Sequence, residues 1–150
     1  MIETRIAAPV ERVFDLARDV DAHVESSAFT GERAVAPGRT SGLLELGDLL
    51  TFEGRHLGVR QRLTVKITEM EPPRRFVDEG VRGAFRELRH VHEFIAEGDG
   101  VTLMRDTVTW RSPFGILGRA ADALFVTRHM RWFVSEKQAR LKTLAERPSR

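Results

Sequence analysis

The segment "QRLTVKITEMEPP", residues 61 to 73, alternates cleanly between apolar and polar side chains. Over residues 61 to 69 the odd-numbered positions carry the apolar residues Leu63, Val65 and Ile67, and two prolines close the segment. Because side chains two apart on a β-strand point to the same face, this pattern predicts a strand with one buried and one solvated face. Proline has no N–H to donate to a neighbouring strand, so the strand is expected to end there. The odd-numbered residues of this segment therefore face inward.

The segment before it, residues 49 to 56, alternates with the opposite parity, because its even-numbered residues include the apolar ones. An even-inward strand can pair with an odd-inward one only through a turn that matches their parities. A two-residue turn at Gly58 and Val59 satisfies this condition by pairing Leu57 with Arg60. The two segments therefore predict an antiparallel hairpin.

The segment "FRELRHVHEF", residues 85 to 94, places His90 and His92 on the same face of a strand. That even-numbered face carries fewer full charges than the odd-numbered face, so we expect the histidines to point inward. A three-residue loop at residues 98 to 100 leads into the next alternating segment. The resulting register sets His92 opposite Asp106.

The strand before these histidines has a weaker pattern. A three-residue loop at residues 83 to 85 would set Asp78 opposite His90. A shift of one residue would turn Asp78 outward instead, and the apolar residues of "RRFVDEGV" fit either register.

The two ends of the chain follow other patterns. Residues 2 to 6 alternate as a short strand, residues 9 to 26 have the spacing of two short helices, and residues 30 to 36 form a further strand. A helix of about 30 residues, roughly 45 Å long, follows Pro113. So long a helix fits a chain of this size if it lies along the hollow of a strongly curved sheet. Its apolar stripe comprises Leu117, Ala120, Ala121, Leu124, Met130, Phe133, Val134, Leu141 and Leu144.

The composition favours one compact domain over residues 1 to 150, since 41% of the 150 residues are hydrophobic. No run of about 18 apolar residues and no secretory leader is apparent, so we expect a cytoplasmic protein without stable membrane insertion. The chain has no cysteine, which excludes disulfides and thiolate chemistry. The net charge is only +2 and arginines are interleaved with acidic residues, which argues against a nucleic-acid partner.

Three segments carry a resemblance to a known family: "IAAPVERVFDLARDVDAH", "RLTVKITEMEPPRRFVDE" and "SPFGILGRAADALF". Together with the order of elements, they resemble the START/Bet v 1-like (SRPBCC) superfamily, in its bacterial polyketide cyclase/dehydrase and lipid-transfer branch. The likeness runs from Ile2 to about Ala145. It implies an α+β helix-grip fold, in which a seven-stranded curved antiparallel sheet surrounds a long C-terminal helix and two short helices join the first two strands. It also implies a deep cavity between the sheet and that helix, but it does not fix the activity.

The inward residues of the strands are the candidate walls of this cavity. Four of them are polar and form the candidate catalytic set, namely Asp78, His90, His92 and Asp106. The candidate ligand-binding residues are Phe52, His56, Leu63, Val65, Phe76, Leu88, Phe94, Met104, Val108 and Trp110. A mostly apolar wall with a few convergent polar groups is typical of small-molecule sites.

Three interpretations fit the four polar residues. They can be buried pairs that satisfy one another, since an unpaired buried polar group costs about 1 to 3 kcal/mol. They can be an acid/base or recognition set, in which a carboxylate orients an imidazole. They can also belong to a zinc site in which His56 joins His90 and His92 and the two aspartates lie in the outer shell, although His-x-His alone is a weak signal and we predict no metal and no cofactor.

The preferred function from sequence is the binding or carrying of a hydrophobic, lipid- or polyketide-like small molecule. A cyclase or dehydratase that uses a His/Asp pair is the first alternative, and a protein-interaction module is the second. The chain has no strong catalytic motif, and its oligomeric state cannot be read from the residue pattern. His23 and His129 lie beside charged residues on predicted helices, so we expect both to be exposed.

Overall fold

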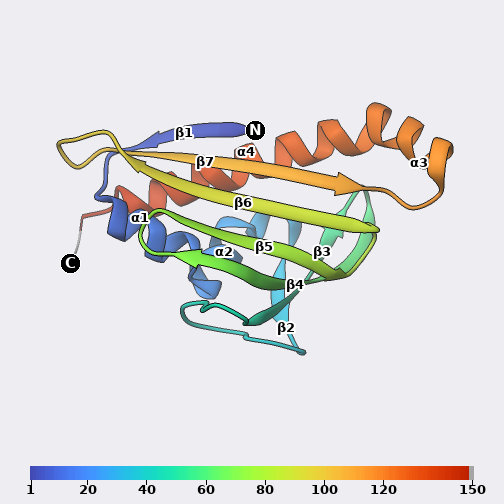
Figure 1. Cartoon of the computed structure of the whole chain (residues 1–150), viewed down its shortest axis with the longest axis horizontal. Helices are drawn as coiled ribbons and strands as arrows, with labels where there is room; N and C mark the ends of the chain where they lie inside the picture. Colours follow the sequence, from blue (N-terminus) through green and yellow to red (C-terminus); the bar gives the residue numbers. More distant parts are fainter. Residues whose placement is uncertain (149–150) are drawn as a thin grey trace.

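The computed structural model describes residues 1–148 and has one antiparallel sheet wrapped against a long C-terminal helix (Figure 1). The seven strands are ordered β1-β7-β6-β5-β4-β3-β2, and two short helices follow β1, as the helix-grip fold requires. The elements are β1 (Ile2–Ile6), α1 (Val10–Ala17), α2 (Val20–Ser26), a 3-10 turn (Ala28–Thr30), β2 (Arg33–Val35), β3 (Leu49–His56), β4 (Val59–Glu71), β5 (Arg75–Arg82), β6 (Glu87–Ala96), β7 (Thr102–Arg111), α3 (Gly115–Ala121), a π-helical turn (Asp122–Val126) and α4 (Thr127–Ala145).

The hairpin of β3 and β4 forms with the predicted parity but with a different turn. His56 pairs with Val59, so the turn residues are Leu57 and Gly58. Both have positive φ, 52° and 76°, as a type I′ turn requires. The prediction of a turn at Gly58 and Val59 was therefore wrong by one position. The inward faces are unaffected, because both turns join an even-inward strand to an odd-inward one.

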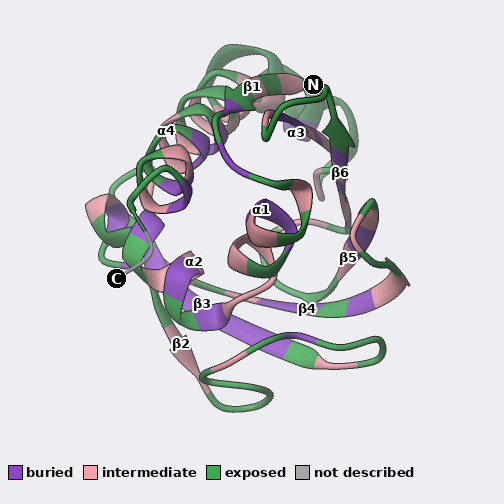
Figure 2. Ribbon diagram, turned by 90° about the vertical axis from the view of Figure 1, so that its left-hand side faces the viewer, coloured by how far each residue is buried: buried purple, intermediate pink, exposed green. Residues whose placement is uncertain are grey.

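The register of β5, β6 and β7 is the predicted one. Asp78 pairs with His90 across β5 and β6, and His92 pairs with Asp106 across β6 and β7. Irregularities in the β4–β5 pairing, at Thr64/Val65 and Ile67/Glu69, allow the long β4 to bend. Seen end-on, the strands curve around an interior that α4 closes on the other side (Figure 2).

The two N-terminal helices fill one end of that interior. Asp19 caps α2 by accepting hydrogen bonds from the N–H groups of Asp21 and Ala22. Phe14 of α1 is fully buried and meets the rings of Phe76 and Phe94 edge-on, with centroids 5.8 and 5.4 Å apart. These aromatic contacts anchor α1 to the sheet.

The C-terminal helix is continuous, but only its second half packs along the sheet. Val134 and Leu141 of α4 are buried, whereas Leu117 of α3 is 80% exposed and Leu124 is 68% exposed. The predicted apolar stripe therefore fails over its first part, because α3 extends past the ends of the strands and finds no sheet to cover it (Figure 1). Within residues 1–148, no helix is both long enough and apolar enough to cross a membrane.

Replacing Phe14 with alanine tests the anchoring of α1. The cavity left among the aromatic rings should lower the free energy of unfolding by about 3 to 5 kcal/mol in denaturant titrations. Phe125→Ala is the matched control and should change stability by less than about 0.5 kcal/mol, because Phe125 is 63% exposed. Equal losses in the two variants would show that the α1 contacts do not carry this stability.

Candidate functional site

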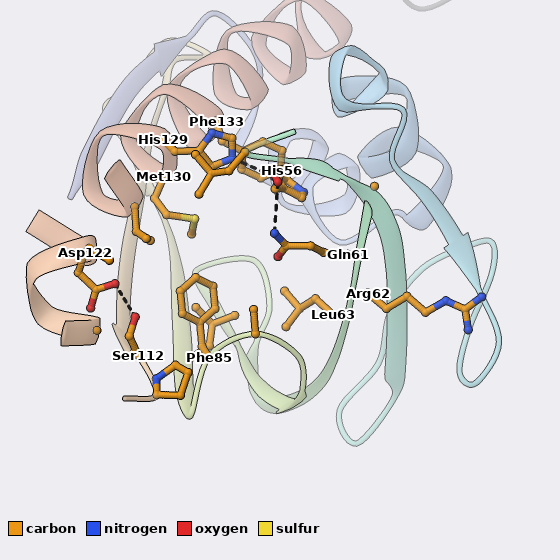
Figure 3. A pocket seen from close by; sticks show the side chains of 18 of the residues that line it. His56, Gln61, Arg62, Leu63, Phe85, Ser112, Asp122, His129, Met130 and Phe133 are labelled. Atoms are coloured by element: carbon orange, nitrogen blue, oxygen red, sulfur yellow. Dashed lines mark hydrogen bonds between the residues drawn. The ribbon is translucent and has the colours of Figure 1, made fainter. Parts of the chain in front are cut away.

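Two adjoining cavities lie between the sheet and the C-terminal helix. The outer chamber, about 280 Å³, lies where α3 meets the β3–β4 hairpin and the loop before β6. The inner chamber, about 90 Å³, lies deeper, beneath α4. Figure 3 shows Met130 and Phe133 of α4 facing Leu63 and Phe85 across the outer chamber, while Arg62 points away from it. The two chambers share the walls formed by Glu32, Phe52, Leu63, Leu88, Met130 and Phe133.

Most of the candidate wall residues line these chambers. Phe52, Leu63 and Leu88 line both. The outer chamber adds His56, and the inner chamber adds Val65, Phe76, Val108, Asp78, His90 and His92.

Three candidate ligand-binding residues are not brought to either chamber, and neither is Asp106 of the candidate catalytic set. Phe94 is taken up by the core around Phe14. Met104 lines only a small crevice of about 20 Å³ beside Asp106. Trp110, near the end of β7, packs against Phe85 at 6.2 Å between ring centroids. They face inward as their parity predicts, but helices or side chains occupy the space in front of them.

The four candidate catalytic residues do form one cluster, which we call the β-cluster: Asp78, His90, His92 and Asp106. His92 lies between the two carboxylates, with Nε2 2.9 Å from Asp78 Oδ2 and Nδ1 2.7 Å from Asp106 Oδ1. The His90 and His92 rings are 3.7 Å apart between centroids. The pairing of β5, β6 and β7 is what places these side chains side by side.

Side chains of α4 and β1 hold the carboxylate of Asp106 in place. Gln138 donates a hydrogen bond of 2.7 Å from Nε2 to Asp106 Oδ2, and its Oε1 accepts one of 2.7 Å from Thr4. Gln138 is 2% exposed. The helix and the edge strand therefore fix the carboxylate that faces both histidines.

The two imidazoles of the β-cluster have opposite protonation tendencies. Burial favours the neutral form of His92, but the carboxylates of Asp106 and Asp78 outweigh it and raise its pKa to about 9. Burial and the neighbouring His92 cation lower the pKa of His90. At neutral pH the cluster thus holds an imidazolium beside a neutral imidazole, the arrangement expected of an acid next to a base. Among the described residues, Nε2 of His90 makes no hydrogen bond, although it lies 3.3 Å from Asp106 Oδ1.

A second group of polar residues was not predicted as a group from sequence, although His56 was a candidate ligand-binding residue. We call it the helix cluster: His23, Glu32, His56, His129 and Lys137. His23 Nε2 lies 3.1 Å from Glu32 Oε2, and its Nδ1 lies 2.7 Å from Lys137 Nζ. Its ring stacks on Phe52 at 3.8 Å. His56 approaches the other oxygen of Glu32 at 3.4 Å and the His129 ring nitrogen at 3.0 Å.

The expectation that His23 and His129 are exposed was therefore wrong. The side chain of His23 is only 15% exposed, and His129 is half-buried against His56. A signal was present: His23 lies three residues after Val20 and three before Ser26, both of which face the interior. Helical spacing puts all three on one face.

Burial and charge set the protonation of the helix cluster. Burial and the nearby Lys137 cation lower the pKa of His23 to about 4, against the opposing effect of Glu32. Burial tends to raise the pKa of Glu32, but its hydrogen bonds with His23 and His56 hold it well below the usual range. Burial lowers the pKa of Lys137, while Glu32, Asp106 and Asp78 act in the other direction.

The β-cluster also has the spacing of a metal site, because Asp78, His90 and His92 each offer a ligand atom within 4.8 Å of the others. Metal binding would require His92 to give up the proton that the two carboxylates stabilise. The three-imidazole set that includes His56 is not assembled, since His56 pairs with Glu32 and His129. The proton on His92 therefore competes with a metal ion for this cluster.

The pKa of His92 predicts how stability depends on pH. Its folded pKa of about 9 lies above the ordinary value of 6.5, so its stabilisation is complete below about pH 6.5 and is lost as pH rises through about 9. We compare the free energy of unfolding of the wild type with that of His92→Gln by denaturant titration at each pH. The difference between the two should decrease by up to about 3 kcal/mol as pH rises across that window. His129→Gln is the control and should keep the wild-type slope. A difference that stays level would contradict a charged His92.

Comparison with known proteins agrees with this architecture. A family model described as "Polyketide cyclase / dehydrase and lipid transport" matches residues 2–146. No curated protein matches the chain.

Several solved structures share the fold. TTHA0849 from Thermus thermophilus is 21% identical, with a TM-score of 0.74 over 95% of this chain and 92% of that one. The Zhui aromatase/cyclase from Streptomyces sp. R1128 is 12% identical, with a TM-score of 0.74 over 97% and 92% of the two chains. A START superfamily protein from Mycobacterium smegmatis is 12% identical, with a TM-score of 0.73 over 97% and 94%. The chain belongs to the polyketide cyclase / dehydrase and lipid transport family.

Proposed function

We propose that the protein binds a hydrophobic small molecule whose apolar body occupies the outer chamber and whose polar end reaches the β-cluster through the inner chamber. The walls of the outer chamber are mostly apolar, and two of its aromatic side chains, Phe52 and Phe133, continue into the inner one. A ligand that enters between α3 and the β3–β4 hairpin would therefore meet apolar surface first.

The observation that carries this proposal is the free hydrogen-bonding capacity at the end of the path. His90 lines the inner chamber, and its Nε2 makes no hydrogen bond within residues 1–148. Asp106 Oδ1, which lies 2.7 Å from His92 Nδ1, makes no hydrogen bond within these residues either. A buried polar atom without a partner costs about 1 to 3 kcal/mol, and a hydroxyl or carbonyl group of a ligand would recover part of it. The neutral state of His90 suits it to either role, as donor or acceptor.

The family description and the solved neighbours are compatible with this proposal. The family description joins cyclases, dehydrases and lipid transport, all of which act on largely apolar molecules. The likeness to individual structures is below 25% identity, so the ligand of this chain has to be found by experiment.

A larger side chain at the wall shared by the two chambers tests the proposal. Compounds extracted from the purified protein and hits from a thermal-shift screen of lipids and aromatics supply the ligand. Met130→Trp places a larger side chain in both chambers and should weaken binding by at least about tenfold, a change of about 1.4 kcal/mol. Leu124→Trp is the control and should leave affinity unchanged, because Leu124 is 68% exposed and lines neither chamber. Absence of extracted compound and of any thermal shift would contradict the proposal.

A second function, cyclase or dehydratase chemistry, is favoured by one further observation. The environments of His90 and His92 push their pKa values in opposite directions, which places a proton donor beside a proton acceptor. Both rings lie at the wall of a chamber that would hold the polar end of the ligand.

The variant His92→Gln separates the two functions. If the bound molecule is converted, the variant should lower kcat by about 10² to 10⁴ while its ligand affinity changes little, because the proton donor is lost and the walls remain. If the molecule is only carried, the variant should change affinity or stability and no product should form in either protein. Turnover and equilibrium binding are measured on the same ligand, and unchanged kcat in the variant would exclude His92 as the acid.

A further inference from the structure

Lysine is rare in this chain, and one lysine is placed unlike the others. The 24 basic residues include only three lysines, at positions 66, 137 and 142. Lys66 is exposed on β4. Lys142 forms a surface ion pair with Glu146 at 3.0 Å. Lys137 instead reaches from α4 to the wall of the inner chamber.

Lys137 contacts a base and not an acid. Its Nζ lies 2.7 Å from His23 Nδ1, and among the described residues it forms no ion pair within 4.0 Å. A lysine that only balanced buried charge would be expected to touch a carboxylate directly. Here the imidazole of His23 stands between Lys137 and Glu32.

The positions of these three side chains fix the direction of proton transfer. His23 Nε2 faces the carboxylate of Glu32 at 3.1 Å, so the ring proton resides on Nε2 and Nδ1 is free to accept. Phe52 holds the ring by stacking at 3.8 Å with an interplanar angle of 11°. His56 approaches the second oxygen of Glu32 at 3.4 Å. The Lys137 amine also lies 3.4 Å from His23 Nε2, so it contacts the imidazole from above its ring. An amine, an imidazole and a carboxylate are thus in contact, the groups found in other sites where a base activates a nucleophile.

The surroundings of Lys137 also favour the free amine. Burial lowers its pKa, against the carboxylates of Glu32, Asp106 and Asp78. Arginine could not serve at this position, because its guanidinium stays protonated in proteins. The chain uses arginine at 21 of its 24 basic positions, so this lysine is an exception to its own composition.

We infer that Lys137, His23 and Glu32 form a covalent binding site that holds the carbonyl group of an aldehyde or ketone ligand as an imine on the Lys137 amine. This inference rests on the proposed function, since it names the chemical class of the ligand for the same chambers. The carbonyl carbon would lie in the inner chamber, where Lys137 and three residues of the β-cluster, Asp78, His90 and His92, form the wall.

The reaction balances without any further reactant. His23 Nδ1 takes a proton from the Lys137 ammonium, and the free amine attacks the carbonyl carbon to form a carbinolamine. The former carbonyl oxygen first gains the amine's second proton and becomes a hydroxyl group. The proton held by His23 then returns to that hydroxyl, which leaves as water as the carbon–nitrogen double bond forms. The net change converts a carbonyl compound and an ammonium into a protonated imine and water.

Trapping with a small aromatic aldehyde tests the inference. The intact protein is incubated with trans-cinnamaldehyde, pulsed with sodium borohydride to reduce any imine to a stable secondary amine, and analysed by intact mass and peptide mapping. Lys137 should be labelled faster than Lys66 or Lys142 by about tenfold or more, because it alone combines a buried amine with a neighbouring base. The variants Lys66→Arg and Lys142→Arg should label as the wild type does, whereas Lys137→Arg should lose the label.

Two further measurements distinguish a chemical role of Lys137 and His23 from a purely structural one. Cinnamyl alcohol has no carbonyl group, and its thermal shift reports whether Lys137→Arg, or Lys137→Met if the arginine variant is unstable, still folds and binds. His23→Gln should label Lys137 more slowly at neutral pH, and its rate should approach that of the wild type above the ordinary lysine pKa of about 10.4, where solvent removes the proton. The charged and titratable groups around Lys137 are His23, Glu32, Asp78, His90, His92 and Asp106, and only His23 differs in this variant.

The outcomes separate this inference from the function on which it rests. Absence of label on Lys137, label spread evenly over the three lysines, or label retained in Lys137→Arg overturns the imine site. An equal rate for wild type and His23→Gln at every pH removes His23 from the proposal and overturns the three-residue site. Absence of cinnamyl alcohol binding counts against the hydrophobic chamber alone.

Discussion

The register of β5, β6 and β7 is the constraint on which the rest of the site depends. It places Asp78, His90, His92 and Asp106 on one patch of the inner face. A slip of one residue in β6 would turn both imidazoles outward and leave two buried carboxylates without their imidazole partners. Unpaired buried charge costs several kcal/mol, so the polar cluster also disfavours the competing registers. The residues proposed to meet the ligand therefore help to specify the sheet that holds them.

The β-cluster could be predicted from sequence because the pairing of neighbouring strands follows from residue spacing along the chain. The side-chain period is two, and loop length relates one strand to the next. The pairs Asp78/His90 and His92/Asp106 follow from those two facts, including the first pair, whose register was ambiguous by pattern. The turn was predicted at Gly58 and Val59 and forms at Leu57 and Gly58, but this error left the inward faces unchanged because it preserved parity.

The helix cluster could not be obtained in the same way. His23 lies on α2, Glu32 lies in the segment before β2, and Lys137 lies on α4. No hydrogen-bond ladder of the sheet fixes the relative positions of these three segments. Their meeting depends on how two helices cross over the sheet. Helical spacing does indicate the inward faces, since Lys137 lies three residues after Val134 and four before Leu141. It does not tell which side chains of two inward faces will touch, nor that α3 continues beyond the sheet.

The two clusters share a choice of residue types that bears on what the cavity is for. The carboxylates of the two clusters, Glu32, Asp78 and Asp106, are met by imidazoles, an amide and the field of one amine. Buried Glu53, which belongs to neither cluster, is instead met by arginines. Arginine cannot release a proton under ordinary conditions, whereas imidazole and amine groups can. Carboxylates on the exterior are thus paired with arginines, which keep their protons, whereas those of the two clusters are paired with groups that can release theirs. A ligand that is only hydrocarbon cannot form hydrogen bonds or exchange protons with these groups. A ligand with a carbonyl or hydroxyl group could do so with both clusters at once.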